Sequence, residues 1–293
     1  MASGGFNEKR SLEEVIFAYD MEPDLRDVFV EGRTDKVLIE HVLSSPNLRV
    51  WEEGEIDVPG DLVTSYGLDI GCKGRVITLA LELEKRLASA DLQVRCIVDA
   101  DSDRVLGTDI IDAKYLRYTD FTCIESYFWD AEHLQKYIKI ALHDTLGFTA
   151  EELIKEMSPI LREVFLLRVV HKYLDEGWKW VEVASCVTAR KGAVSFDREK
   201  FMRKYLQSNS AWHRREEFEQ VVEIHRAKLD ADIRHSLQGH DLTGIVSELV
   251  KECVKPKALG QPEVVARMLA MTIEREDSLK FPLLREFAES DAK

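Results

Sequence analysis

The sequence predicts an α/β protein, with a parallel sheet in its first half and a mainly helical second part. Two apolar runs, 28–30 and 94–98, each lead directly into acidic residues, as buried strands of a parallel sheet do at a ligand-binding edge. Helical spacing of apolar residues lies between them, and such strand–helix–strand crossovers make strands parallel. Beyond residue 130, helix caps and helical spacing dominate. We therefore expect a lead-in over 1–24, a sheet domain over 25–130 and a mainly helical domain over 131–293.

Composition limits the class of protein. The 293 residues carry a net charge of −14, which disfavours a protein that coats nucleic acid nonspecifically but does not exclude a local basic groove. The five cysteines are odd in number and form no Cys-x-x-Cys pair, so we expect reduced, packed thiols. Apolar runs long enough to cross a membrane and a signal-peptide pattern are both missing from the sequence. We expect a cytoplasmic protein without membrane contacts.

The first elements are indicated by turn and cap signals. Residues 1–9 are expected to be a flexible lead-in, and Ser11 is suited to cap a short helix. The apolar run 28–30 then forms a strand, and Gly32 allows a sharp turn into a helix. Apolar residues on one side of this helix pack on the sheet, and the helix is expected to stop around 44–46.

The rest of the sheet domain continues this alternation. Residues 56–58 are a plausible short strand, and the loop 71–75 precedes a helix over 76–87 with apolar residues at helical spacing. That helix is expected to pack on the sheet before the chain returns as the strand 94–98.

The second part shows repeated helix signals. Thr149 begins a capping box, and Pro159 is expected in the first turn of a further helix. Residues 181–184 allow one extra strand. The tail predicts two helices, 264–273 and 281–288, which either cover the core or form an oligomer contact.

Acidic residues follow both principal strands. Glu31 follows the first strand, while Asp99 and Asp101 follow the second, so neighbouring parallel strands would direct all three side chains into one crevice. Several carboxylates in one place need a cation, and hard oxygen ligands favour Mg²⁺ over zinc. One Asp-x-Asp segment by itself is more often a solvated loop, but two acid-tipped strands together favour a metal site. Asp35 and Asp103 are second choices.

Three short motifs resemble a known family. Residues 28–36 read VFVEGRTDK, residues 96–103 read CIVDADSD and residues 120–128 read DFTCIESYF. A glutamate after a first strand and an Asp-x-Asp after a later strand resemble the pattern of TOPRIM domains, which occur in topoisomerases, primases and nucleases. The sequences of these three motifs are most similar to those of TOPRIM-like nucleases encoded beside ATPases in bacterial anti-phage defence loci, including the nuclease subunit of the PARIS system. The resemblance covers roughly 25–130.

This resemblance implies a TOPRIM (Rossmann-like) fold and a Mg²⁺-dependent endonuclease, with Mn²⁺ as an alternative ion. Phosphodiester hydrolysis needs metal to activate a water and to offset charge on the leaving oxygen, and acids to hold the metal. Glu31 is expected to position a second metal or act as base. The implied catalytic residues are Glu31, Asp35, Lys36, Asp99, Asp101 and His240, and the implied metal ligands are Glu31, Asp99, Asp101, Asp103 and Glu125.

Two of these assignments have alternatives. The family has a glutamate where Glu125 stands, but a polar residue there is equally suited to cap the helix near Asp130. In the resembling families a lysine often stands where His240 stands. This departure leaves the role of His240 open, and a lone histidine before a helix is more often structural. Asp241 is the expected cap of that helix.

Basic residues suggest nucleic-acid contacts in two places. Arg33 and Lys36 are expected to meet the scissile phosphate. Lys73 and Arg75 lie beside glycines ahead of a helix, so they either hold a phosphate or form an ordinary solvated turn. Residues 190–215 interleave basic residues with aromatics, which suits either an RNA backbone with unstacked bases or an amphipathic helix with buried aromatics. The expected contacts in that segment are Lys191, Arg203, Lys204, Arg214 and Arg215.

The resemblance also implies partners. It predicts an AAA- or ABC-type ATPase that sequesters the chain, a structured RNA substrate with transfer RNA as the leading case, and a homodimer once the chain is released. A catalytically silent subunit that binds a partner ATPase is one alternative, and a DNA-directed nuclease of OLD type is another. A topoisomerase is disfavoured because the chain lacks a strand-passage module.

Overall fold

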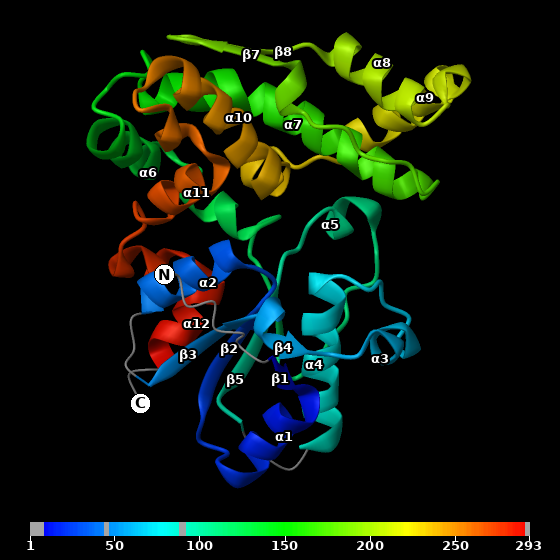
Figure 1. Ribbon diagram of the computed structural model, residues 1–293, viewed down its shortest axis with the longest axis vertical. Coiled ribbons are helices and arrows are strands. Elements are labelled where there is room, and N and C mark those ends of the chain that lie inside the picture. Colours follow the sequence, from blue (N-terminus) through cyan, green and yellow to red (C-terminus); the bar gives the residue numbers. More distant parts are fainter. Residues whose placement is uncertain (1–8, 44–46, 88–91, 291–293) are drawn as a thin grey trace, which may run out of the picture. The chain divides into compact units, whose positions relative to one another are not determined.

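The computed structural model describes residues 9–43, 47–87 and 92–290, and the chain forms two compact units (Figure 1). The first unit comprises 1–99, 110–120 and 274–293, and the second comprises 100–109 and 121–273. This division differs from the expected boundary at residue 130, because two short segments after the second acidic strand pack with the helical unit and the tail packs with the sheet. The expected flexible lead-in over 1–9 lies almost entirely outside the described residues.

A four-stranded parallel sheet forms the centre of the first unit. Its strand order is β3-β2-β5-β6. The alignment of Phe29 with Cys96 sets β2 and β5 side by side, so both strands end at the same edge. The strands are β2 (Arg26–Val30), β3 (Leu48–Glu52), β5 (Val94–Val98) and β6 (Leu116–Tyr118). The predicted α/β class with a parallel sheet is therefore confirmed.

Helices cover both faces of this sheet. Helices α2 and α12 lie on one face, and α1 and α4 lie on the other (Figure 1). The predicted apolar stripe on α4 is confirmed, since its buried side chains include Val76, Ala80 and Leu83. The helices are α1 (Leu12–Met21), α2 (Arg33–Leu43), α3 (Gly60–Ser65), α4 (Cys72–Arg86) and α12 (Pro282–Ser290).

The predicted N-terminal lead-in contains a core helix. Ser11 caps α1 through a capping box with Glu14, as expected. Helix α1 then buries four residues against the sheet unit, Leu12, Val15, Ile16 and Tyr19. The periodicity of these apolar residues makes α1 part of the fold.

The short strand predicted at 56–58 is confirmed, but it lies outside the four-stranded sheet. The expected strand at 56–58 is the short β4 (Ile56–Asp57), which pairs with β1 (Arg10–Ser11) in a separate two-stranded sheet. The neighbour of β2 is instead β3, which buries Val50 and carries Trp51. Its charged residues hid the strand pattern in the sequence, because β3 is an edge strand with one partly exposed side.

The second unit is mainly helical, as predicted. Its helices are α5 (Asp103–Leu106), α6 (Ala131–Lys136), α7 (Ala150–Leu174), α8 (Arg198–Ser208), α9 (Arg215–Arg226), α10 (Gly239–Cys253) and α11 (Pro262–Ala270). A π-helical turn, Tyr137–Ala141, follows α6. Two antiparallel strands, β7 (Val187–Arg190) and β8 (Ala193–Phe196), form a hairpin in this unit (Figure 1).

Short 3₁₀ helices complete both units. They span Glu53–Glu55 and Arg275–Lys280 in the first unit, and Ile124–Phe128, Ala184–Cys186, Trp212–Arg214, Ile233–His235 and Lys257–Gly260 in the second.

Helix α7 corrects two predictions in this part of the chain. The capping box at Thr149 is confirmed, but Pro159 lies inside one continuous helix instead of opening a second one. The expected strand at 181–184 is absent from the described structure, where this stretch leads into a 3₁₀ turn before the hairpin.

Two further expectations concern the whole chain. The five cysteines are free thiols, and Cys96, Cys123 and Cys186 are buried, as predicted. In the described ranges, every helix is too short or too polar to span a bilayer.

Candidate functional site

The carboxyl end of β2 places Glu31 at the edge of the first unit's sheet. Strand β2 buries Val28, Phe29 and Val30 completely, and the chain turns at Gly32 into α2. The Glu31 carboxylate accepts a hydrogen bond from the backbone N–H of Asp99 at 2.7 Å. Glu31 therefore contacts the main chain of Asp99 where two adjacent parallel strands end. That the side chains of Glu31, Asp99 and Asp101 share one crevice stays a prediction.

Lys73 and Cys72 also lie at this edge. The Lys73 ammonium donates to the backbone carbonyl of Asp99 at 2.6 Å, so Lys73 stabilises the end of β5. Partial burial and the negative charges of Glu53 and Glu31 raise the pKa of the Cys72 thiol. The Cys72 thiol thus lies close to two carboxylates at this edge.

The turn after Glu31 is held by Asp35. The Asp35 carboxylate accepts the Gly32 N–H at 2.9 Å and so fixes the start of α2. The Lys36 ammonium pairs with the Glu55 carboxylate at 2.7 Å and is mostly buried. Through these contacts, Asp35 and Lys36 stabilise the local structure next to Glu31.

Two basic residues of this unit that were predicted to contact phosphate, Arg33 and Arg75, lie near glutamates of the chain itself. Arg75 pairs with Glu53 at 3.3 Å and also donates to a backbone carbonyl. Arg33 is largely exposed and lies 3.7 Å from Glu52. A Cβ at Gly74 would collide with the backbone carbonyl of Asp69, so close packing explains this glycine without a bound anion.

Asp101 and Asp103 belong to the second unit. Asp101 has a left-handed backbone with φ of 47°, and its N–H donates to the Thr122 carbonyl at 2.7 Å. Its carboxylate lies 3.4 Å from the side-chain amide of Gln238. Asp103 accepts a hydrogen bond from Lys172 at 2.9 Å. Aspartate tolerates the left-handed region better than most residues, which suits Asp101 to this turn.

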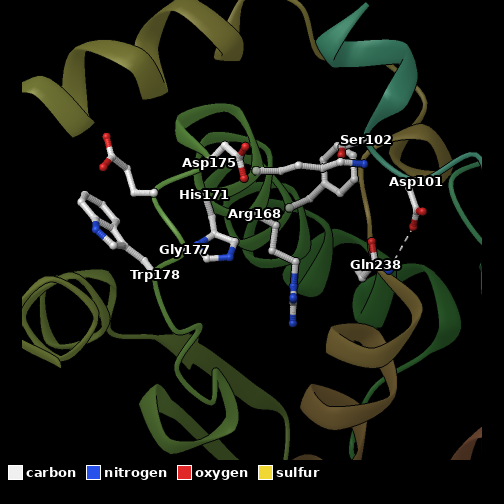
Figure 2. A pocket seen from close by; sticks show the side chains of 11 residues that line it. Asp101, Ser102, Arg168, His171, Asp175, Gly177, Trp178 and Gln238 are labelled. Carbon is white, nitrogen blue, oxygen red and sulfur yellow. Dashed lines mark hydrogen bonds between the residues drawn. The ribbon is translucent and has the colours of Figure 1, made fainter. Parts of the chain in front are cut away.

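Asp101 lines a pocket of about 340 Å³ within the second unit (Figure 2). One face of α7 contributes Arg168 and His171 to the lining. The Arg168 guanidinium forms a bidentate pair with Asp241. Partial burial and the nearby charge of Arg168 lower the pKa of His171. The pocket therefore combines a fixed guanidinium with an imidazole whose pKa lies below its ordinary value.

Asp241 was expected to cap α10, and this expectation is wrong. The N-cap of α10 is Gln238, and Asp241 lies in the first turn of the helix, where it pairs with Arg168. Ionic pairing with α7 explains the aspartate better than capping does.

Glu125 and His240 lie near each other in the second unit. Helix α6 is capped by Asp130, which accepts the His133 N–H at 3.0 Å, so Glu125 does not cap it. Burial raises the pKa of the Glu125 carboxyl, while interactions with Cys123 and His240 act in the opposite direction. A Cβ at Gly239 would collide with the Glu125 carboxylate.

The basic segment 190–215 is extensively paired with glutamates. Arg214 pairs with Glu217 and Glu176, and Arg215 pairs with Glu199. Lys204 donates to the Ser185 hydroxyl. Arg203 and Lys191 are exposed, and neither has an ion-pair partner among the residues that the structure describes. Arg203 and Lys191 are thus the best placed of the predicted contacts to meet an external phosphate.

Most aromatics of this segment are core residues. Phe201 and Tyr205 are fully buried and stack on each other with ring centroids 5.9 Å apart. Trp212 remains 43% exposed, with the Arg215 guanidinium over its ring. Phe201 and Tyr205 therefore follow the amphipathic-helix alternative.

The predicted site residues fall into two sets. The first unit brings together Glu31, Asp99, Asp35, Lys36 and Lys73, and the second holds Asp101, Asp103, Glu125 and His240. Sequence reasoning missed Arg168, His171 and Lys172. Their signal was a polar stripe at helical spacing on a long helix, which resembles an ordinary solvated face.

Within the described ranges, no three His, Cys, Asp or Glu side chains lie close enough together to hold a metal ion. The chain matches no protein-family model, and no curated protein is significantly similar to it.

Proposed function

We propose that this chain is a Mg²⁺-dependent TOPRIM-type endonuclease. The observation that carries the proposal is the bond from the Asp99 N–H to the Glu31 carboxylate, which joins two acid-tipped, adjacent parallel strands. Ligands of open α/β sheets bind outside the carboxyl ends of the strands, where these two residues lie. The TOPRIM-like motifs at 28–36 and 96–103 support the same reading.

The donor set suits a hard divalent ion. Mg²⁺ is commonly held by one or two carboxylates and completed by water and substrate phosphates, and Glu31 and Asp99 provide two carboxylates at one edge. Asp101 follows Asp99 after one residue, so the covalent chain keeps their Cα atoms within about 7 Å. Mn²⁺ has the same preference for oxygen ligands and is the alternative ion.

The residues around this pair have supporting roles in the proposal. Mg²⁺, when bound, would acidify a water and offset charge on the scissile phosphate. Glu31 is oriented by its hydrogen bond from the Asp99 N–H, and Lys73 donates to the Asp99 carbonyl and so fixes the same main-chain residue. Asp35 holds the turn that presents Glu31. Preorganisation of this kind keeps a reactive geometry in place before substrate arrives.

Structured RNA, with transfer RNA first, is the proposed substrate, and an AAA- or ABC-type ATPase is the proposed partner that restrains the chain in the cytoplasm. The resemblance to defence-locus nucleases supports both. A nuclease with a preformed site would damage its host, so external restraint followed by homodimerisation on release is consistent with that biology.

A metal titration tests the proposal directly. The purified chain is incubated with transfer RNA, other structured RNA and duplex DNA over a range of Mg²⁺ and Mn²⁺ concentrations, and cleaved ends are mapped. We expect metal-dependent RNA cleavage that Glu31→Gln abolishes. An inert wild-type chain under all metals would favour the silent interaction subunit, and DNA cleavage alone would favour the OLD-type nuclease.

A cellular test examines the restraint. We expect expression of the chain alone to be toxic in a manner that requires Glu31, and co-expression of an ATPase from the same locus to relieve toxicity. A harmless wild-type chain would contradict the restraint.

A further inference from the structure

The pocket beside Asp101 has the dimensions of a small-ligand site. Its volume of about 340 Å³ is at the lower end of the range of roughly 300–1,000 Å³ that is typical of ligand pockets. Helix α7 lines it with Arg168, His171 and Lys172, and Asp175 follows at the end of the same face. A space of this size suits one nucleoside better than a folded RNA segment.

The charges of the lining residues disfavour the binding of a phosphate group in this pocket. The lining has three carboxylates, those of Asp101, Asp175 and Glu176, and two cationic side chains, and Glu176 is paired with Arg214 outside the lining. Both cations already have acidic partners, since Arg168 pairs with Asp241 and Lys172 pairs with Asp103. A neutral group that donates hydrogen bonds is therefore favoured over an anion.

The lining also suits a flat ring. Phe165, His171 and Trp178 contribute aromatic surface, and the Nδ1 of His171 bonds the Tyr205 hydroxyl at 2.8 Å, which fixes the imidazole plane. Figure 2 shows Asp175 and Trp178 on the α7 side of the pocket and Asp101 with Gln238 across from them. The arrangement combines ring surfaces with acceptors at the rim.

We propose that this pocket binds one unstacked nucleobase of the strand that is cleaved, and that it prefers bases with an exocyclic amino group. The proposal rests on the proposed nuclease function, because it takes the base from an RNA strand that the chain cleaves. Carboxylates accept hydrogen bonds from the amino group of cytosine, whereas uracil presents a carbonyl at the same position. Asp175 is the proposed acceptor, because Glu176 already pairs with Arg214.

Asp175 offers a clean substitution. It caps the end of α7 in a left-handed conformation with φ of 46°, which asparagine also tolerates. Asp175→Asn removes the acceptor charge and introduces a donor, with little change in shape. Asp144→Asn is a matched control, since Asp144 is an exposed aspartate of the same unit with φ of 56° outside the pocket.

The first measurement compares cytidine with uridine, which differ at the amino position. Binding to the full chain is followed by NMR through the Trp178 indole signal, which Trp178→Phe identifies. We expect cytidine to bind about 2- to 10-fold more tightly than uridine, the range of one hydrogen bond. Asp175→Asn should abolish or reverse this preference, and Asp144→Asn should retain it.

The second measurement separates a base of the substrate from a free nucleoside. Cleaved RNA ends are mapped for wild type and both variants. We expect an enrichment of amino-bearing bases at one fixed position from the cut, which Asp175→Asn loses. An unaltered cut-site pattern in Asp175→Asn, or a rate that responds to added cytidine without any base preference, would overturn the proposal.

The nuclease function and the pocket can fail separately. Cleavage without nucleoside binding, or equal binding of cytidine and uridine, overturns the base pocket and leaves the nuclease intact. Selective cytidine binding that Asp175→Asn removes, in a chain that never cleaves RNA, supports the pocket chemistry and overturns the nuclease.

Discussion

Strand β2 carries a carboxylate at each end, and the two have opposite surroundings. At the amino end, buried Asp27 forms a bidentate pair with Arg49 and accepts hydrogen bonds from Trp51 and from Tyr19 at 2.6 Å. At the carboxyl end, Glu31 is held by a backbone N–H. A carboxylate surrounded by side-chain donors stabilises the fold, whereas Glu31 at the other end of the strand is a proposed metal ligand.

The same contrast divides the basic segment 190–215. Arg198 bridges Glu163 and Glu219, and thereby joins α7, α8 and α9. Arg203 lies on α8 only a few residues away, yet no ion pair to it is found in the described part of the chain. Neighbouring basic residues with the same charge therefore differ in their ion-pair partners, and one of the predictions below tests whether they also differ in RNA binding.

The largest expected effect is the loss of RNA cleavage when Glu31, at the carboxyl end of β2, is replaced. Glu31→Ala should lower RNA cleavage by about 10³-fold or more, because several kcal/mol of charge stabilisation at the phosphate depend on the metal site. The folded state should be as stable as wild type or more so, since one negative charge leaves an acidic edge. Single-turnover cleavage and urea unfolding measure both. Glu22→Ala, an exposed acid on α1's end, is the control.

Asp27→Ala should show the reverse pattern. Its loss leaves Arg49 and the Tyr19 hydroxyl without their shared partner, which should lower the free energy of unfolding by about 2–4 kcal/mol. The measurement is the urea midpoint at neutral pH. A variant within about 0.5 kcal/mol of wild type would contradict the structural role.

Glu163 allows a pH test of the carboxylates that are paired with arginines. Burial alone would raise the pKa of the Glu163 carboxyl, but hydrogen bonds from Arg226 and Arg198 outweigh it and lower the pKa below its ordinary value of 4.5. The stability from this group is therefore present above that pH and is lost as the pH falls through the lowered pKa. Glu163→Gln removes the titrating carboxyl, so the Tm of the variant should fall less on acidification than the Tm of wild type. An equal loss of Tm on acidification in wild type and Glu163→Gln would contradict this role of Glu163.

The smallest effect concerns the basic segment. Neutralising Arg203 and Lys191 together should weaken RNA binding a few-fold and reduce the slope of log affinity against log salt by about 1.4, the value for two lost phosphate contacts on a single strand. Neutralising Arg214 and Arg215 together should leave that slope unchanged, because glutamates already pair with both. Identical slopes for the two double variants would remove the distinction.

The sequence by itself determined the α/β class, the two acid-tipped strands, the helical second part and several caps. These features depend on local periodicity and on cap chemistry, so neighbouring residues contain the signal. The pairing of Glu31 with Asp99 was also predictable, because parallel strands that both end in acids place them at one edge. The edge strand β3 was missed since its pattern is mixed with charged residues.

Only the tertiary structure decided which charged side chains have ion-pair partners. Arg214 and Arg203 look alike in the sequence, and their partners come from side chains that folding brings near or leaves distant. The same holds for the pocket beside Asp101, whose lining joins the end of α7 with Gln238 and the turn after β5. Contacts between residues far apart in the chain depend on packing, and local sequence patterns contain no record of them.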